Sequence, residues 1–339
     1  MDSTSDCPVC ASPAAPAVRY TAQEAAGFFC PPHRDADRNQ RLEAAIRDLW
    51  AGDACTVHRC PSCGFGFGDP YVGGDDAFYT ALREQMAYPS WRWDYDVAVD
   101  ALSSTPVARV LDVGAGSGAF LRSLPDGVGR FAVESSPTTI AALAGAGVEA
   151  RARLEDFGPE YDAGFDAVTL FQVLEHIAPA RETLRQCARL LRPGGLLVVT
   201  VPEAQAMFDQ ESVLGAPDMP PNHVNRWTPA SLSMAVEQVG LRPEDHQAEP
   251  GGLGQVRGKV HLRILRDAQR PRSLAGLAYR VRSRAVRAGL LVAIAPLVLA
   301  RLLPHTRYLL SGGAFALVAA RPYADEPVPL ASREFAAES

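Results

Sequence analysis

The sequence contains almost no lysine and no long uninterrupted apolar segment. Lys259 is the single lysine among 33 basic residues, so arginine supplies nearly all of the positive charge. The longest apolar run without a charge is 288–300, 13 residues that Pro296 interrupts. A membrane-spanning helix needs about 20 apolar residues, so we expect no transmembrane segment. The first residues also lack the basic and apolar regions of a signal peptide, which predicts a cytoplasmic protein.

Extremes of composition are absent as well. Hydrophobic residues make up 47% and charged residues 21% of the 339 residues, which excludes a disordered chain, a fibrous repeat and a small disulfide scaffold. The net charge of −6 argues against a polyanion binder as a whole. The charges are nevertheless uneven: residues 107–250 carry 11 basic and 19 acidic side chains, whereas 257–310 carry 12 basic and one acidic side chain.

Six of the seven cysteines lie within the first 63 residues. Cys7 with Cys10, and Cys60 with Cys63, form two C-x-x-C pairs, and a glycine follows the second pair. Without export, clustered thiols indicate a metal site rather than disulfides. Four thiolates in two such pairs are typical of tetrahedral zinc, so we predict a structural zinc site in a small module over residues 1–68.

A second set of ligands has the spacing C-x-x-H. Cys30 precedes His33, and Cys55 precedes His58, each by three residues. These four residues could form a second zinc site. The alternative is one zinc ion that uses four of the eight groups.

From residue 107 onwards, short apolar runs alternate with stretches of helical periodicity. Strands are expected over 107–113, 130–134, 167–171 and 196–201, and later over 241–249 and 315–320. Helices are expected over 34–50 and 179–191, and a turn over 192–195. This alternation predicts an α/β fold with a doubly wound parallel sheet.

A glycine-rich loop follows the first of these strands. Asp112 stands at the strand end, two residues before the first glycine of Gly114-Ala115-Gly116-Ser117-Gly118. The loop also fits a relaxed dinucleotide pattern, but a carboxylate beside a pyrophosphate would repel it. Asp112 instead favours a ligand with a positive amine and sulfonium. Glu134, 20 residues after Gly114, is placed to accept hydrogen bonds from ribose hydroxyls.

Together with these residues, several segments resemble a class I S-adenosylmethionine-dependent methyltransferase. The segments are VLDVGAGSG, AVESS, LEDF, FDAVTLFQVLEH, LLRPGGLLVVTVP and HVNRWTPASL. The resemblance covers about residues 80–250 and a terminal strand near 313–321. It implies a Rossmann-like seven-stranded sheet whose last strand is antiparallel. The zinc module before this fold resembles bacterial methyltransferases encoded with sugar and natural-product pathways.

The resemblance also assigns the cofactor contacts. Asp112 and the three glycines would hold the methionine end of S-adenosylmethionine, and Glu134 would hold the ribose. The backbone amide of Leu154 would meet the adenine, with Asp156 as the acceptor for its amino group, because Arg153 stands where many members have Asp. The candidates beside the methyl group are Phe171 and Gln172.

Candidate catalytic residues lie on loops around this site. His223, in the loop 220–227, is the best candidate for a general base, with Asn222 beside it. His176 is expected near the mouth of the active site. Tyr88, in the aromatic connector 69–106, could line the acceptor pocket with its neighbours. A purely structural role remains the alternative for each of them.

The sequence therefore predicts methyl transfer from S-adenosylmethionine to a hydroxyl, amine or carbon of a small molecule, such as a sugar or secondary metabolite. The alternative is an RNA methyltransferase whose zinc module grips the nucleic acid. Residues 1–66 carry six basic and eight acidic side chains, which weighs against this alternative. A nicotinamide dehydrogenase and a non-catalytic binding protein are further alternatives, against which Asp112 and the complete glycine loop argue.

The predicted organisation has six parts: a zinc-binding module (1–68), a helical connector or lid (69–106), a catalytic domain (107–256), a basic and apolar helical insert (257–312), a last strand (313–323) and a polar tail (324–339). The insert could dock on the acidic catalytic domain or on a second subunit. It could also meet an anionic membrane surface or a lipid-linked substrate through residues 257–304, or bind RNA phosphates. The oligomeric state is left open.

Overall fold

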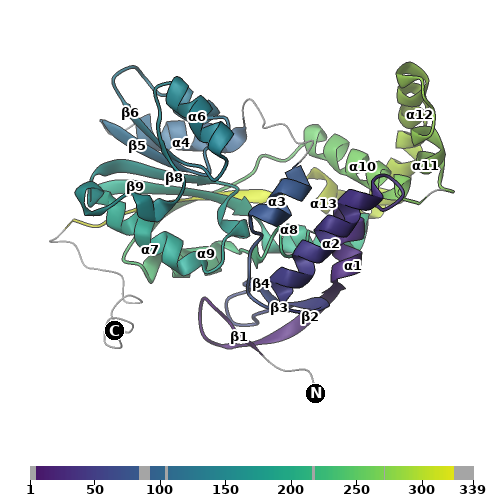
Figure 1. The fold of residues 1–339 in the computed structure, drawn as a ribbon, viewed down its shortest axis with the longest axis horizontal. Helices are drawn as coiled ribbons and strands as arrows, with labels where there is room; N and C mark the ends of the chain where they lie inside the picture. The colour runs from purple at the N-terminus through teal and green to yellow at the C-terminus, as the bar shows by residue number, and fades with distance from the viewer. Residues whose placement is uncertain (1–4, 84–91, 104–105, 216–217, 271, 324–339) are drawn as a thin grey trace.

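The computed structural model describes residues 5–83, 92–103, 106–215, 218–270 and 272–323. These residues form two sheets and a helical arm (Figure 1). The strands are β1 (Ser5–Asp6), β2 (Pro13–Thr21), β3 (Ala54–Arg59), β4 (Gly66–Asp69), β5 (Arg109–Val113), β6 (Gly129–Val133), β7 (Glu149–Arg151), β8 (Phe165–Phe171), β9 (Leu191–Pro202), β10 (Asn225–Arg226), β11 (Arg242–Ala248) and β12 (Ala314–Ala320). The helices are α1 (Ala22–Phe29), α2 (Ala36–Trp50), α3 (Asp76–Arg83), α4 (Trp93–Ser103), α5 (Ala119–Ser123), α6 (Pro137–Gly145), α7 (Ala180–Leu190), α8 (Ala204–Asp209), α9 (Pro229–Glu237), α10 (Leu253–Ala268), α11 (Leu274–Tyr279), α12 (Arg284–Leu302) and α13 (Thr306–Leu310).

The larger sheet has seven strands in the order β11-β12-β9-β8-β5-β6-β7. Strands β9, β8, β5, β6 and β7 are parallel, whereas β12 is antiparallel to both of its neighbours. The predicted α/β sheet with an antiparallel last strand is confirmed. The strand order reverses between β5 and β8, and in such sheets ligands bind beyond the carboxyl ends of the strands at this point.

Both faces of this sheet are covered by helices. Val110, Ala167 and Val198 pack on the layer that contains α4, α5 and α6. Their neighbours Leu111 and Val168 point to the other face, towards α7 and α9. Figure 1 shows α4 and α6 on one side of the strands, with α7 and α9 on the other. Because both faces are buried, these strands read as continuous apolar runs.

The predicted turn at 192–195 is a bulge at the start of β9. Phe165 of β8 pairs with Leu191, but Ala167 pairs with Leu196, so residues 192–195 loop out between the two pairs. Gly194 has a φ of +75°, which glycine adopts without strain. Strand β9 therefore begins earlier than the predicted 196–201.

The smaller sheet belongs to the N-terminal module and has the strand order β1-β2-β3-β4-β10. Its last strand, β10, comes from the methyltransferase-like region, so the two parts of the chain share one sheet. The predicted helix over 34–50 is α2, whose Leu42, Ile46 and Trp50 are buried against α1 and Phe78 of α3. The connector contributes α3 and α4.

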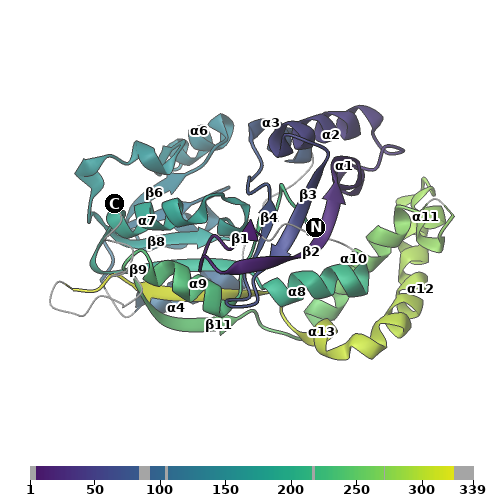
Figure 2. The same ribbon diagram turned by 90° about the horizontal axis from the view of Figure 1, so that it is seen from below.

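The segment between β11 and β12 forms an arm of helices α10–α13. Figure 2 shows this arm projecting from one end of the large sheet. Its continuous helical stretch Arg284–Leu310 has 27 residues and is long and apolar enough to cross a membrane, by length and composition only. From the sequence we expected no such helix, because the charge-free run 288–300 is too short to cross a membrane. The structure corrects this expectation, since the helical stretch extends beyond that run at both ends. Only 11% of the apolar window is buried in the protein.

Candidate functional site

The glycine loop leaves the carboxyl end of β5 at the point where the strand order reverses. Gly114, Gly116 and Gly118 have φ values of +76°, +51° and +72°, which other residues rarely adopt. A Cβ atom on Gly114 would lie 2.5 Å from the Val173 side chain, and one on Gly118 would lie 2.5 Å from Leu143. The loop therefore requires glycine for its conformation as well as for close approach.

A pocket of about 330 Å³ lies against this loop. Of the predicted cofactor residues, it is lined by Asp112, Gly114, Gly116, Glu134, Phe171 and Gln172. The structure thus brings together six residues from three separate segments of the sequence. Gly118 lies below the pocket as the N-cap of α5. Among the lining residues that sequence reasoning did not assign are Tyr79, Tyr95 and Ala152.

Asp112 is a buried carboxyl group at the floor of this pocket. Its side chain is 3% exposed, and its Oδ1 accepts a hydrogen bond from Thr169 Oγ1 at 2.8 Å. Burial raises the pKa of Asp112 to about 7, against the opposing effect of the Thr169 hydroxyl. The nearby carboxylates of Asp94 and Glu134 raise this pKa further. A cationic ligand would reverse this effect and hold the group ionised.

Glu134 is the second buried carboxylate of the pocket, at the end of β6. Its Oε2 accepts a hydrogen bond from the backbone N–H of Gly116 at 2.9 Å, and its Oε1 accepts one from Ser135 N–H at 3.0 Å. These bonds fix the carboxylate at the rim of the glycine loop.

The residues predicted for the adenine lie just outside the pocket. Leu154 is buried in a 3-10 turn (Leu154–Asp156). The Asp156 carboxylate turns back and accepts from the backbone N–H of Arg153 at 3.0 Å. Neither residue lines the pocket in its present shape, whereas Ala152 does. Capping of its own turn is thus the role that the structure shows for Asp156.

At the other end of the pocket, β8 terminates with Phe171 and Gln172. Phe171 packs edge-on against Tyr95 and Phe120, with ring centroids 4.8 and 4.9 Å away. Gln172 has a φ of +56°, a left-handed conformation that costs about 1 kcal/mol or more for a residue with a side chain. Its Nε2 is buried without a hydrogen-bond partner among the described residues. Such strain and an unpaired donor are typical of a binding site.

A guanidinium group faces the acidic floor from the connector. Arg92 lines the pocket, and its Nε donates to Asp94 Oδ1 at 3.0 Å. Asp94 is fully buried and also accepts from Thr200 Oγ1 at 2.8 Å. The pocket therefore offers carboxylates for a cation, a guanidinium for a carboxylate and an unpaired amide donor. This donor set fits S-adenosylmethionine, which carries an amine, a carboxylate, a sulfonium and a ribose.

A cluster of titratable side chains adjoins the methyl end of the pocket. Ligand atoms of Glu175, His176 and His223 all lie within 4.8 Å of one another. The two imidazole rings are 4.5 Å apart, and Nδ1 of His223 is 2.7 Å from Oδ1 of Asp218. His176 also lines the pocket, so the cluster reaches into it.

The protonation of this cluster follows from burial and charge. Burial raises the pKa of Glu175 to about 7, while the nearby His223 acts in the opposite direction. Burial alone would lower the pKa of His223, but the Asp218 carboxylate outweighs it and the net shift is upward. The pKa of Asp218 is lowered in turn, because His223 outweighs its burial. The cluster therefore holds groups that exchange protons near neutral pH.

The backbone fixes the tautomer of His176. Its Nδ1 lies 2.6 Å from the carbonyl oxygen of Asn222, and a carbonyl can only accept. Nδ1 therefore carries the hydrogen, and Nε2 is the nitrogen that can take up a proton. Asn222 thus contributes its main chain to the site. Asn225 ties the same regions together, because its Nδ2 donates to the carbonyls of Leu174 and Ile177 at 2.8 and 2.7 Å.

Two members of this cluster were not assigned from the sequence. Glu175 lies inside the quoted LEH segment, and its position four residues after the end of a buried strand was the available signal. Asp218 is five residues before His223 and meets it only because the chain turns at Pro220 and Pro221. The remaining catalytic candidate, Tyr88, lies outside the described residues, as does Trp91.

The four C-x-x-C cysteines converge in the N-terminal module. Their sulfur atoms all lie within 4.8 Å of one another, with 3.7 Å between Cys7 and Cys63 and 3.4 Å between Cys10 and Cys60. Zinc bound to four thiolates at about 2.3 Å would place the sulfurs about 3.8 Å apart. The cluster therefore has the dimensions of a closed tetrahedral site.

The structure does not bring the C-x-x-H residues together as a second site, which corrects the prediction of them as possible metal ligands. Cys55 and His58 lie on β3, where a separation of three places side chains on opposite faces. His58 stacks on Phe67, with its Nε2 3.6 Å from Asp69, whereas the Cys30 thiol contacts the Asp35 carbonyl at the start of α2. His33 is exposed in the same loop as Asp35. Within the described ranges, the groups of clustered metal ligands include none of these four residues.

The cysteine cluster is fastened to the loop that carries His223. Thr228 Oγ1 donates to the carbonyl of Cys63 at 2.9 Å, and Gln238 Nε2 donates to the carbonyl of Val9 at 2.6 Å. Phe65, two residues after Cys63, packs on Trp227 with ring centroids 4.5 Å apart. The module therefore supports the acceptor side of the pocket.

Comparisons with known proteins find similarity to methyltransferases. Residues 90–246 match a family model described as a methyltransferase domain. An enzyme named ubiquinone biosynthesis O-methyltransferase from Xanthomonas oryzae pv. oryzae is 35% identical over 117 residues, 32% of this chain and 48% of the relative. Its counterpart from Xanthomonas axonopodis pv. citri is 32% identical over 154 residues, 41% of this chain and 64% of the relative. The chain thus spans about half to two thirds of the length of these relatives.

Solved structures are similar at lower identity. A SAM-dependent methyltransferase from Archaeoglobus fulgidus aligns with 73% of this chain and 100% of its own, at 17% identity and a TM-score of 0.43. Phosphoethanolamine N-methyltransferase 2 from Haemonchus contortus, in complex with S-adenosyl-L-methionine, aligns with 68% of this chain and 53% of its own, at 17% identity and a TM-score of 0.42. The family match covers residues 90–246, a little under half of the chain, which are therefore similar to a methyltransferase domain.

Proposed function

We propose that the chain, whose residues 90–246 match a methyltransferase domain, transfers a methyl group from S-adenosylmethionine to a hydroxyl group of a small molecule. One observation carries the choice of a hydroxyl: the buried acid–base cluster of Glu175, His176, His223 and Asp218 at the methyl end of the pocket. A hydroxyl must lose a proton when it is methylated, and such a cluster can accept it. The printed names of the curated relatives, O-methyltransferases, support the same choice.

When bound, S-adenosylmethionine supplies an electrophilic methyl group on a positively charged sulfur. Asp112 would hold its ammonium group, Arg92 its carboxylate and Glu134 its ribose hydroxyls. Because the sulfonium is already activated, the protein mainly positions the reactants and excludes water. The packed rings of Tyr95, Phe120 and Phe171 make the end of the pocket at the terminus of β8 apolar.

The proton of the acceptor passes to His176 in this scheme. Its Nε2 would take up the proton that the acceptor hydroxyl loses when it receives the methyl group. His223, held by Asp218, lies beside His176 and packs against its ring. The sequence favoured His223 as the general base. We assign the first proton acceptor to His176 instead, because His176 lines the pocket.

We further propose that Cys7, Cys10, Cys60 and Cys63 bind one structural zinc ion. The dimensions of the cluster support this, and four thiolates leave no position for a substrate. The ion would fix the module that holds Thr228 and Trp227, and through them the His223 loop. The RNA-methylating alternative has less support, because residues 1–66 are net acidic.

The first test is binding of S-adenosylhomocysteine by calorimetry, with NAD as the competing ligand. Micromolar binding of the former alone supports the proposal, and binding of NAD alone contradicts it. A second test incubates labelled S-adenosylmethionine with a panel of phenols, sugars and amines. Methylation of amines in preference to all hydroxyl compounds would overturn the assignment of the acceptor.

A further inference from the structure

Helix α12 is apolar on the side that faces solvent as well as on the side that faces the protein. Val298 and Leu302 are buried against α10, whereas Val292 is 72% exposed and Leu297 is 56% exposed on the outer side. Between Arg287 and Arg301 the helix carries no charged residue. A helix that is apolar all round is normally buried in a protein or in lipid, and here the protein leaves the outer side uncovered.

A groove continues this apolar surface. It has a volume of about 790 Å³ and runs between α10 and α12, where exposed Leu253 lines it together with Val292 and Pro296. The outer side of α12 and this groove form one apolar surface on the arm. An uncovered surface of this kind marks a site of interaction.

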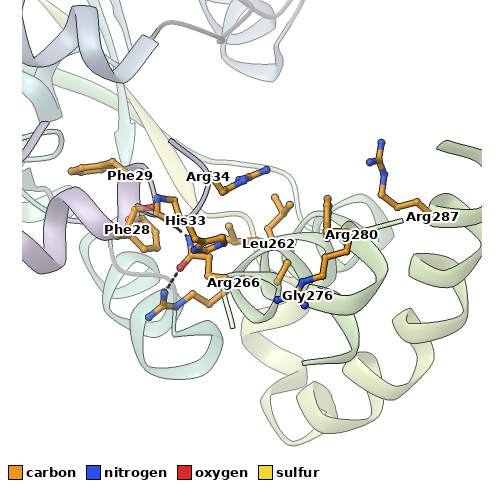
Figure 3. A pocket seen from close by; sticks show the side chains of 14 residues that line it. Phe28, Phe29, His33, Arg34, Leu262, Arg266, Gly276, Arg280 and Arg287 are labelled. Atoms are coloured by element: carbon orange, nitrogen blue, oxygen red, sulfur yellow. Dashed lines mark hydrogen bonds between the residues drawn. The ribbon is translucent and has the colours of Figure 1, made fainter. Parts of the chain in front are cut away.

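Basic side chains surround one end of α12. Arg280, Arg282 and Arg284 are exposed at or just before the first turn of the helix. Figure 3 shows Arg280 and Arg287 beside a second pocket of about 440 Å³, together with Arg34 and Arg266. No carboxylate is among the described residues that line this pocket. The end of the apolar surface is therefore a place where phosphate groups would be attracted.

The chain path decides how the arm could meet a membrane. The arm begins and ends at the same point of the sheet, since Gly252 N–H donates to the Leu310 carbonyl and Gly313 N–H donates to Glu249 Oε2. If α12 crossed a bilayer, the rest of the arm would have to cross with it. Helix α10 carries four basic residues and one acidic residue in 16 positions, which makes such a crossing costly. The arm can therefore lie on a membrane but not span it.

We propose that helices α10–α13 dock the protein peripherally on an anionic phospholipid bilayer. The outer side of α12 enters the acyl region of one leaflet, and Arg280, Arg282, Arg284 and Arg287 contact the phosphate groups. Two facts select lipid over a second copy of the chain or a nucleic acid. Residues 257–310 carry 12 basic and one acidic side chain, so two such arms repel each other. The uncovered surface is apolar, and the phosphate groups of a nucleic acid would not cover an apolar surface.

Flotation of the full chain with lipid vesicles tests the proposal. We expect the protein to float with vesicles of phosphatidylcholine containing about 30% phosphatidylglycerol, and not with pure phosphatidylcholine, at low ionic strength. Salt at about 0.5 M should release most of the protein, because it screens the arginine–phosphate attraction. No flotation with either vesicle, or equal flotation with both, would overturn the proposal.

Two pairs of variants separate the apolar and the charged contributions. Val292→Asp with Leu297→Asp should weaken vesicle binding about tenfold or more, whereas Val99→Asp, at an exposed valine of α4, should not change it. Arg282→Gln with Arg284→Gln should weaken binding about tenfold, whereas the exposed pair Arg41→Gln with Arg185→Gln should leave it unchanged. Near-ultraviolet circular dichroism checks that each variant is folded.

Two competing occupants give different results. If the protein forms a dimer in ultracentrifugation and Val292→Asp with Leu297→Asp makes it monomeric while vesicle binding is absent, the second copy covers the surface and the proposal is wrong. It is equally wrong if a single-stranded RNA of about 30 nucleotides binds through the arginines and the vesicles do not. Affinity for S-adenosylhomocysteine should be the same in all of these variants, which keeps the outcome independent of the methyltransferase assignment.

Discussion

At the scale of single residues, the carboxyl group of Asp112 is buried, which makes its ionised form unfavourable until a cationic ligand binds. Its carboxyl group lies almost out of contact with water, with Thr169 as its hydrogen-bond donor, and burial raises its pKa to about 7. In the unfolded chain its pKa is about 3.9. The group is therefore largely neutral in the folded protein below about pH 6 and incurs a desolvation cost when it ionises above about pH 7. A cationic ligand offsets that cost.

The affinity for S-adenosylhomocysteine should consequently rise with pH. About a tenth of a group with a pKa of about 7 is ionised at pH 6 and about nine tenths at pH 8, so binding should be roughly tenfold tighter at pH 8. Isothermal titration calorimetry across this range measures the effect. Asp112→Asn should bind at least about tenfold more weakly at pH 8 and show a much flatter pH dependence. An unchanged profile in the variant would assign the titration to another group.

The raised pKa of Asp112 also predicts the sign of the change in the free energy of unfolding in Asp112→Asn. The stability that neutral Asp112 provides is present below its unfolded pKa and is lost as the pH rises through about 7. Asp112→Asn stays neutral at every pH. Without ligand it should therefore be more stable than the parent protein at about pH 8, by an amount that shrinks towards about pH 5. Urea unfolding at the two pH values measures the difference, and a constant difference would contradict the prediction.

The two histidines should respond differently to substitution. His176→Asn removes the proposed proton acceptor and should lower kcat by a factor of about 100 or more, with little change in affinity for S-adenosylhomocysteine. His223→Asn removes the neighbouring titratable ring and should lower kcat less, while shifting the pH–rate profile. Once an acceptor is identified, kcat against pH for both variants measures this. A larger loss in His223→Asn would return the role of base to that residue.

At the scale of elements, the short strand β10 is the joint between the two sheets. Asn225 and Arg226 pair with Phe67 and Gly66 of β4, while the Asn225 side chain holds the turn that carries Glu175 and His176. Its Oδ1 also accepts from Tyr71 at 2.8 Å. Arg226 is buried and donates to the Asp218 carbonyl at 3.1 Å. One two-residue strand thus positions both halves of the acid–base cluster.

Asn225→Ala should loosen this joint. It leaves two buried carbonyls and the Tyr71 hydroxyl without their partner, which costs about 2–4 kcal/mol of the free energy of unfolding. We expect kcat to fall as well, because His176 is held by the same turn, while the affinity for S-adenosylhomocysteine changes little. Urea unfolding and calorimetry measure the two effects. The control is Gln205→Ala, at an exposed side chain of α8, which should be neutral in both measurements.

At the scale of the whole molecule, the N-terminal module acts as a support for the acceptor side of the domain. The cysteine cluster belongs to the same hydrophobic core as Trp227 and the α7 and α9 layer of the large sheet. The module therefore cannot loosen without exposing part of the core beneath the large sheet. A metal ion bound there would stabilise the catalytic loop from a distance.

Loss of the metal should thus reduce both stability and turnover. We expect one equivalent of zinc in the purified protein by mass spectrometry, and less than half an equivalent in Cys60→Ser. That variant should unfold at lower urea concentration, because a structural zinc site contributes directly to folding. Cys187→Ser, at a buried cysteine of α7 far from the cluster in sequence, should keep its zinc. Two equivalents in the parent protein would contradict the single site.

The sequence by itself determined the large sheet and the identity of the glycine loop, because both depend on local patterns. Apolar runs of strand length, the glycines after β5 and the carboxylates at strand ends are written in consecutive residues. It also indicated the C-x-x-C pairs, since knuckle spacing is local. The C-x-x-H pairs have the same spacing, but β3 places Cys55 and His58 on opposite faces, and only the fold shows this.

Only the tertiary structure decided what distant segments do together. Asp218 meets His223, and His176 rather than His223 lines the pocket, because loops after β8 and β9 converge at the end of the sheet. The outer side of α12 is uncovered because the arm leaves and rejoins the sheet at one point, which the periodicity of the helix cannot reveal. Local sequence specifies elements, whereas burial, charge pairing and exposure arise from contacts between residues far apart in the chain.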